Sequence, residues 1–234
     1  MGWLRWSPQG EARLRCLAPW AALSGAAVLG AATLATTGSS SVERFVGPIP
    51  VPIVAAAAGV AGIGALAFLE RRGFWRCSTG ATTARGVVIA GAAAAPFAAA
   101  AIGVDVAVGF PADTNVAWPQ AWAVYPVIAV VAEAALHLVP LGGLVWLTRS
   151  RFDDQRLTAR TWALVLATAA VEPAVQVVLG SALWAFVVPH VFVIGVVELL
   201  LLRRFGYVPM VAFRFVYYLA WHVLWGQARL ELLF

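Results

Sequence analysis

Two ionisable residues, Glu133 and His137, lie one helical turn apart in the apolar stretch from Pro126 to Pro140, PVIAVVAEAALHLVP. Residues four apart project from the same face of a helix, so the carboxylate and the imidazole should lie together. Such a pair can activate water, with the carboxylate as general base and the imidazole as a donor to an oxyanion. It can also bind a divalent metal ion. Ionisable groups are costly in lipid, so within a membrane this pair would be a candidate functional site.

The composition places that stretch in a membrane. Of the 234 residues, 62% are hydrophobic and 12% are charged, and the mean hydropathy is +0.86. Several apolar runs are about 20 residues long, which is the length that crosses a bilayer. The net charge of +5 lies in short loops and at helix ends, so it indicates membrane topology rather than a nucleic-acid surface. The sequence predicts an all-α polytopic membrane protein.

Polar breaks divide the chain into about seven predicted transmembrane helices. Their approximate bounds are 17–37, 50–69, 86–110, 118–147, 161–180, 183–202 and 208–228. Residues 1–16 form a predicted interfacial amino-terminal segment. The first three helices make up region 17–110, and the other four lie in region 118–234, which contains the polar residues of interest. Pro126 and Pro140 are each expected to kink the fourth helix.

The arginines fall on alternate sides of this topology. With the amino terminus inside, the arginines of 1–16, 70–85, 149–160 and 203–204 are all cytoplasmic, and the other side carries only Arg44 and Arg229. This asymmetry agrees with the positive-inside rule. We therefore expect an integral membrane protein with a cytoplasmic amino terminus, and we take the membrane to be a bacterial plasma membrane. Cys16 and Cys77 fall on the cytoplasmic side and are expected to be free thiols.

Polar side chains on the last four helices share one depth. By helix rise, Glu133 lies roughly 24 Å and His137 roughly 18 Å from the arginine nearest their helix. The other members of this predicted layer are Glu172, Gln176, His190 and His222. Glu172 and Gln176 again share one helical face.

Glu198 and Arg214 lie nearer the cytoplasmic side, on adjacent helices. Each would be costly alone in lipid, so we predict a structural ion pair between them.

The carboxyl-terminal half, about residues 125–227, resembles the CAAX-protease and bacteriocin-processing (CPBP) family of intramembrane glutamic proteases. That family carries EExxxR on one helix, FxxxH on a later one and HxxxN on the last. Ala132 and Glu133 stand in the double-glutamate position, and His137 stands in the arginine position.

Two stretches compete for the middle motif of the family. The literal FxxxH match is Phe186 to His190, whereas Glu172 to Gln176 lies nearer the expected place. The last motif resembles His222-Val-Leu-Trp-Gly226, which has glycine in the asparagine position.

The resemblance implies a helical intramembrane peptidase that hydrolyses a membrane-associated peptide. In that hypothesis Glu133 activates water, His190 positions it and His222 stabilises the oxyanion. His137, Glu172 and Gln176 support the site. The resemblance implies no certain cofactor, and a divalent metal remains a candidate ligand of the acidic and imidazole groups.

The departures from the family motifs favour an alternative. Ala132 and Gly226 replace an acid and an asparagine of the family pattern, so the chain could be a non-catalytic relative. It would then be a scaffold or accessory subunit that binds a partner membrane protein or membrane lipids. The sequence leaves both hypotheses open.

Overall fold

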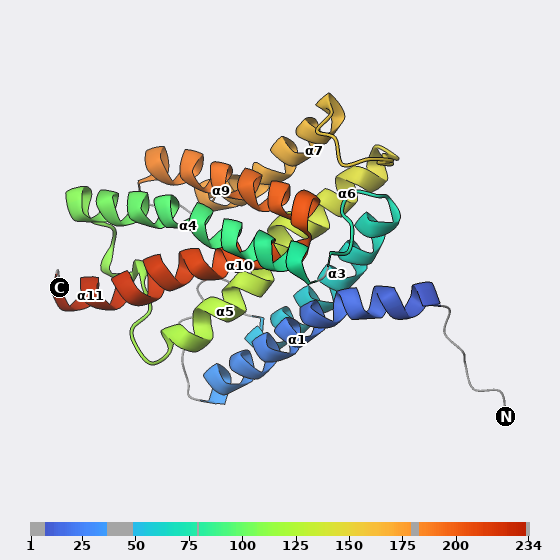
Figure 1. Ribbon diagram of the computed structural model, residues 1–234. Coiled ribbons are helices and arrows are strands. Elements are labelled where there is room, and N and C mark those ends of the chain that lie inside the picture. Colours follow the sequence, from blue (N-terminus) through green and yellow to red (C-terminus); the bar gives the residue numbers. More distant parts are fainter. Residues whose placement is uncertain (1–7, 37–48, 79, 179–182, 233–234) are drawn as a thin grey trace.

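The computed structural model describes residues 8–36, 49–78, 80–178 and 183–232. Every regular element in these residues is helical (Figure 1). Within this described part of the chain, seven helical stretches are long and apolar enough to cross a membrane, namely Cys16–Thr36, Val51–Arg71, Ala81–Val108, Ala121–Leu147, Ala159–Val178, Trp184–Phe205 and Tyr207–Leu232. The prediction of an all-α polytopic membrane protein with seven spans is therefore confirmed.

Several spans consist of more than one element. The described elements are α1 (Pro8–Thr36), α3 (Val51–Arg71), α4 (Ala81–Val108), η1 (Ala112–Thr114), α5 (Ala121–Ala132), η2 (Glu133–Leu138), α6 (Val139–Leu147), α7 (Ala159–Ala169), α8 (Val171–Val178), α9 (Trp184–Phe205), α10 (Tyr207–Tyr218), η3 (Leu219–Trp225) and α11 (Gly226–Leu232). Helix α1 continues without a break from Pro8 into the first span. Residues 1–7 of the predicted interfacial segment lie outside the described residues.

The fourth and seventh spans each contain a π-helical segment. η2 holds Glu133 and His137, and η3 holds His222. Pro140 lies just after η2 and has no N–H to donate to the carbonyl of Leu136, so a regular α-helical bond is lost there. Segments of this kind occur frequently at functional sites.

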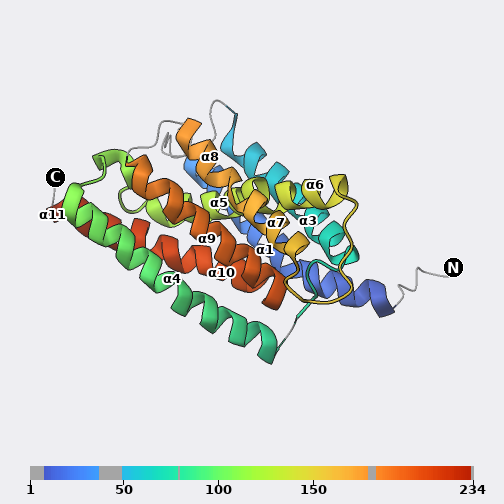
Figure 2. The same ribbon diagram turned by 90° about the horizontal axis from the view of Figure 1, so that it is seen from above.

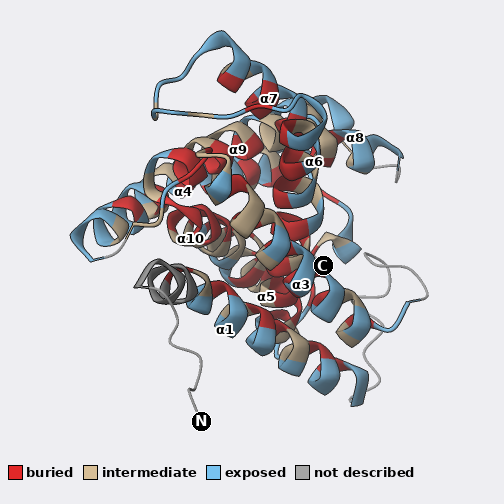
Figure 3. Ribbon diagram, turned by 90° about the vertical axis from the view of Figure 1, so that its right-hand side faces the viewer, coloured by how far each residue is buried: buried red, intermediate tan, exposed pale blue. Residues whose placement is uncertain are grey.

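The last span runs through the middle of the bundle. α10 packs against α4, α5 and α9, whereas α1 packs against α3 and α5 (Figures 1 and 2). Buried residues lie on the inward faces of the helices, and exposed ones lie outside (Figure 3). The fourth and seventh spans therefore bring their polar residues into a shared interior.

Small residues let α1 and α3 approach closely. The Nε1 of Trp20 donates to the carbonyl of Gly59 over 2.9 Å, and a Cβ at Gly62 would collide with the Trp20 ring. Glycine at such contacts is typical of membrane helix pairs.

Arg203 joins two connections at the arginine-rich end of the bundle. Its Nη1 donates to the carbonyl of Phe74 over 2.8 Å, and its Nη2 donates to the carbonyls of Asp154 and Arg156 over 2.9 Å. The guanidinium also lies over the rings of Phe74 and Phe152. The loops near residues 74 and 154, which the sequence assigned to one side of the membrane, therefore lie together.

The two cysteines form a disulfide, so the expectation of free thiols is wrong. The start of the first span and the connection between α3 and α4 lie side by side, and the Cα atoms of Cys16 and Cys77 are 5.8 Å apart. This separation is typical of bonded cysteines. Cys16 and Cys77 are 61 positions apart in the chain, and nothing in the sequence indicated that they lie close together.

A buried ion pair fixes the opposite end of the bundle. Asp105, near the end of α4, lies 2.7 Å from the Nε of Arg229 in α11, and both side chains are fully buried. The same carboxylate accepts from the indole of Trp225 and from the amide of Phe110. Arg229, which the sequence assigned to the outer side as one of two arginines, is therefore part of the interior.

Candidate functional site

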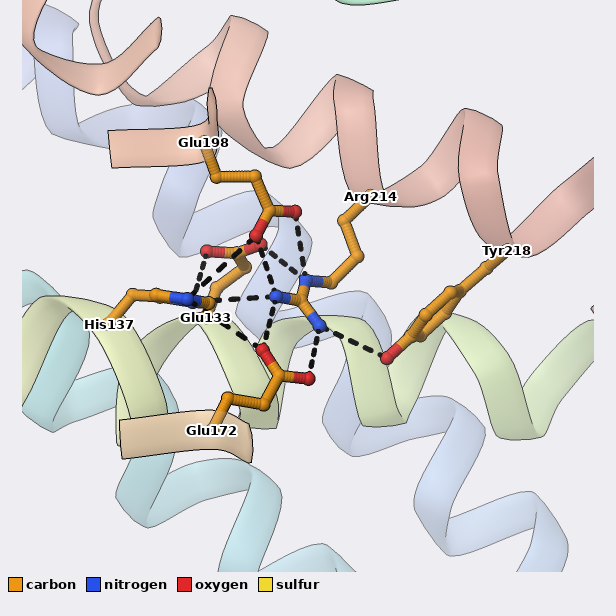
Figure 4. A network of polar contacts seen from close by, with 6 residues as sticks. All are labelled: Glu133, His137, Glu172, Glu198, Arg214 and Tyr218. Carbon is orange, nitrogen blue, oxygen red and sulfur yellow. Dashed lines mark hydrogen bonds and ion pairs between the residues drawn. The ribbon is translucent and has the colours of Figure 1, made fainter. Parts of the chain in front are cut away.

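Arg214 is the centre of the polar layer (Figure 4). Its Nε donates to Oε1 of Glu133 over 2.5 Å and to Oε1 of Glu198 over 3.1 Å. Its Nη2 donates to Oε2 of Glu198 over 2.7 Å and to Oε2 of Glu172 over 2.8 Å, and its Nη1 donates to Oε1 of Glu172 over 3.0 Å. Nη1 also donates to the hydroxyl of Tyr218 over 3.2 Å. All five N–H groups of the guanidinium therefore have acceptors.

These partners come from four different spans. η2 supplies Glu133, α8 supplies Glu172, α9 supplies Glu198, and α10 supplies Arg214 and Tyr218. Glu172 and Glu198 each form two parallel bonds with the planar guanidinium, the geometry that distinguishes arginine from lysine. We call these five residues together with His137 the Arg214 cluster. The predicted partners Glu198 and Arg214 are in contact, but within a larger network.

Local structure directs two cluster members inward. The fifth span is interrupted at Ala170, and Pro173 lies in the first turn of α8, where a missing N–H costs little. Glu172 is buried at this break. In η2, Glu133 and His137 keep a common face, with Nδ1 of His137 3.4 Å from Oε2 of Glu133.

The imidazole of His137 also lies near the carboxylates of Glu172 and Glu198. Its Nε2 is 3.7 Å from Oε2 of Glu172 and 3.9 Å from Oε2 of Glu198. Gly195 makes room for this ring, because a Cβ there would come within 3.0 Å of Nε2. The cluster is closed to the surface, since the exposed fraction is 0% for Glu133, His137 and Glu198, 6% for Glu172 and 2% for Arg214.

The charges of the Arg214 cluster do not balance without protons. Three carboxylates face one guanidinium, so full ionisation with a neutral imidazole leaves two net negative charges. Net charge is costly inside a membrane. We therefore expect at least one of the three carboxyl groups to be protonated at neutral pH.

Infrared difference spectroscopy of the reconstituted protein tests this expectation. A protonated carboxyl gives a C=O stretching band at neutral pH that a carboxylate lacks. We expect at least one of Glu133→Gln, Glu172→Gln and Glu198→Gln to reduce that band, and Glu231→Gln, on the exposed part of α11, to leave it unchanged. Bands of equal intensity in the wild type and all three cluster variants would contradict it.

Glu133, His137 and Glu198 could supply ligand atoms for a metal ion, but their surroundings do not suit one. Ligand atoms of Glu133, His137 and Glu198 lie within 4.8 Å of one another, and carboxylates and imidazole are common ligands of divalent cations. The guanidinium of Arg214, however, donates to both carboxylates and lies 3.4 Å from Nδ1 of His137. A metal there would sit beside a fixed positive charge. The cation of this cluster is Arg214 itself.

His190 belongs to an aromatic group beside the cluster. Its Nε2 lies 3.2 Å from the hydroxyl of Tyr217, and its ring stacks on Phe186 with centroids 4.7 Å apart. The Phe97 ring packs against it from α4. The spacing that matches FxxxH therefore produces an aromatic pair on one face of α9.

His222 lies in another group, toward the end of the bundle that holds Arg229. Its ring stacks on Tyr125 with centroids 4.6 Å apart, and it forms a T-shaped contact with the Tyr218 ring, with centroids 5.0 Å apart. Nδ2 of Asn115 lies 3.5 Å from Nδ1 of His222 and donates to its carbonyl over 3.3 Å. A Cβ at Gly226 would lie 2.5 Å from that amide. The absence of a side chain at Gly226 thus leaves space for Asn115, which lies in the loop between α4 and α5.

The structure gathers some of the predicted site residues and separates others. Glu133, His137 and Glu172 meet around Arg214, whereas His190 and His222 contact the neighbouring Tyr217 and Tyr218. Gln176 is half-buried on α8 and is not a member of the cluster.

Sequence reasoning did not assign Tyr218 or Asn115 to the layer. Tyr218 follows Arg214 at a spacing of four, which places both on one helical face. That spacing could have identified Tyr218. Asn115 lies in a loop, and no signal in the sequence links it to His222.

Comparison with known proteins gave no match: no family model, curated protein or solved structure is similar to this chain.

Proposed function

We propose that this protein is a non-catalytic membrane scaffold or accessory subunit, a divergent CPBP-like chain whose polar layer holds its helices together. The observation that carries this proposal is the position of Arg214. Its guanidinium occupies the space between Glu133, Glu172 and Glu198, where a peptidase would need water and substrate.

The state of Glu133 supports this assignment. A general base must lie within hydrogen-bond reach of the water that it activates. Oε1 of Glu133 accepts from Arg214, Oε2 faces His137, and the side chain is fully buried. The two histidines that would position water and stabilise an oxyanion are instead engaged with Tyr217 and Asn115.

A structural cluster of this kind has a clear physical role. Helices in lipid gain little from apolar contact with one another, because lipid tails are equally apolar. Polar side chains that satisfy each other across helices give the bundle one specific arrangement. Arg214 contacts carboxylates of three other spans, so it sets the relative positions of four helices.

An intramembrane peptidase is the second candidate. It is favoured by the convergence of Glu133, His137 and Glu172 from separate spans, and by the Asn115 amide beside His222, which supplies the group missing at Gly226. In that case the Arg214 cluster would have to open to admit water and a membrane-associated peptide.

Glu133→Gln separates the two candidates. We expect equal and negligible cleavage of prenylated CAAX peptides and membrane-tethered reporter peptides by the wild type and the variant. We also expect a loss of roughly 1–3 kcal/mol in unfolding free energy, because a charged acceptor of Arg214 is removed. Cleavage is followed by mass spectrometry, and stability by thermal unfolding in detergent.

His222→Ala is the second arm of this experiment. Cleavage by the wild type that is lost in both Glu133→Gln and His222→Ala, with melting temperatures unchanged, would favour the peptidase and reject the scaffold.

We further propose that the protein resides in a bacterial plasma membrane with its amino terminus in the cytoplasm. The arginines of the 70–85 and 149–160 loops support this orientation. The Cys16–Cys77 disulfide lies at the same end, although disulfides are rare in the cytoplasm. Labelling of the two thiols from each side of the membrane, before and after reduction, tests the orientation directly.

A further inference from the structure

A groove of about 690 Å³ lies at the arginine-rich end, and none of its lining residues belongs to the Arg214 cluster. Four segments form it: the start of the first span, the connection between α3 and α4, the first two turns of α4, and the junction of α9 and α10. Most of its wall is apolar, and it includes Pro19, Val87, Val88, Phe205 and Val208. Helix α4 lies at the side of the bundle, so one wall of the groove borders the membrane (Figure 2).

Close packing fixes the segments around the groove. A Cβ at Gly86 would lie 2.6 Å from Pro209 and 2.7 Å from Phe205, so α4 is pressed against the junction of α9 and α10. The hydroxyl of Ser78 donates to the carbonyl of Phe205 and lies 3.1 Å from the Thr83 hydroxyl. The groove is therefore preformed, with two hydroxyl groups in its wall.

Three exposed arginines stand next in the sequence to residues that line the groove, although none of the three is itself a lining residue. Arg76, Arg85 and Arg204 each adjoin a lining residue in the sequence, and each comes from a different segment. The lining residues include no carboxylate. Arg76 donates one hydrogen bond to the backbone carbonyl of Asp153, and this uncharged acceptor does not neutralise the arginine. The apolar wall of the groove thus lies within one residue of three arginines, and we call these three residues the arginine rim.

We propose that this groove binds a phospholipid with an anionic headgroup. An acyl chain would lie along Val87, Val88 and Val208, and the phosphate would lie at the arginine rim. Basic pockets between transmembrane helices bind anionic headgroups, and arginine forms paired bonds with phosphate. The acyl chains of a neutral phospholipid would pack against the apolar wall equally well, but its headgroup would be attracted less strongly to the arginine rim. The site is separate from the Arg214 cluster, and its existence does not depend on the proposed scaffold function.

Native mass spectrometry of the full chain tests the proposal. The protein is released from vesicles of phosphatidylcholine mixed with phosphatidylglycerol, and the bound lipids are counted. We expect the wild type to retain phosphatidylglycerol in preference to phosphatidylcholine. Arg85→Gln combined with Arg204→Gln should reduce that preference roughly 30-fold, the combined effect of two arginines near an anionic surface. Arg160→Gln, an exposed arginine on α7, should leave it unchanged.

A second variant tests the apolar wall. Ala84→Trp places a large ring in the groove and should reduce retention of both lipids while the arginines stay in place. Melting temperatures confirm that each variant is folded. Equal retention of the two lipids by the wild type would overturn the proposal. So would a preference that survives in the Arg85→Gln, Arg204→Gln variant, or that falls as much in Arg160→Gln.

Discussion

Arg214→Leu is expected to be the most damaging single substitution in the protein. It leaves Glu133, Glu172 and Glu198 buried together without their shared cation. Removal of one partner from a buried ion pair costs roughly 3–5 kcal/mol. For a chain of this length that loss corresponds to a fall of about 6–20 °C in Tm. Thermal unfolding of the purified protein in detergent measures it.

Two controls show whether charge or shape is responsible. Arg160→Leu removes an exposed arginine and should leave Tm unchanged. Arg214→Lys keeps the charge but cannot form the paired bonds with Glu172 and Glu198, so its Tm should fall between those of the wild type and Arg214→Leu.

Neutralising the carboxylates should rescue the loss. In the Arg214→Leu background, Glu172→Gln and Glu198→Gln remove two unpaired negative charges, so the Tm should rise. An Arg214→Leu protein as stable as the wild type, or one that these additions destabilise further, would contradict the structural role of the cluster.

The seven spans could be predicted because length and composition alone determine them. A span must be about 20 residues long and apolar, and its ends must be polar. Pairs such as Glu133 and His137 could be predicted equally well, because a helix fixes which residues share a face. These are local properties, and each can be read from one stretch of sequence.

The centre of the polar layer could not be predicted in the same way. The distance of Arg214 from the helix end placed it nearer the cytoplasmic side than Glu133. A long arginine side chain, however, carries its charged group well away from its own Cα. Depth along each helix also says nothing of rotation about its axis. His190 and His222 have similar predicted depths to Glu133 but face aromatic neighbours.

Contacts between segments that are distant in the chain could not be predicted from the sequence either. Asn115 meets His222 because the loop between α4 and α5 folds over the end of the last span. Cys16 meets Cys77 because α1 and the loop after α3 lie side by side. Neither contact follows from spacing, since both depend on which helices are neighbours.

Arg229→Leu is expected to cause the second large loss. Asp105 would remain fully buried without its cation, at a cost of roughly 3–5 kcal/mol. Arg229 also donates to the carbonyls of Phe110 and Pro111, so those acceptors would lose a partner too. Because the pair joins α4 to α11 at one end of the bundle, opening should begin there. Hydrogen exchange should accelerate in residues 105–111 and 226–232 before the rest of the bundle is affected.

The double variant separates the ion pair from simple packing. Asp105→Leu with Arg229→Leu removes both charges, and such replacements are often close to neutral, so its stability should exceed that of Arg229→Leu alone. Glu231→Gln, an exposed acid on α11, should change neither Tm nor exchange.

Additive losses in the double variant would show that the two charges are not coupled. Coupling, by contrast, would mean that ion pairs at two depths hold the last span: Arg214 in the polar layer and Arg229 near its end. A helix held at two depths cannot slide along its axis without breaking one pair. The register of the last span, and with it the contacts of Tyr218 and His222, would then be set by these two arginines rather than by the apolar surface around them.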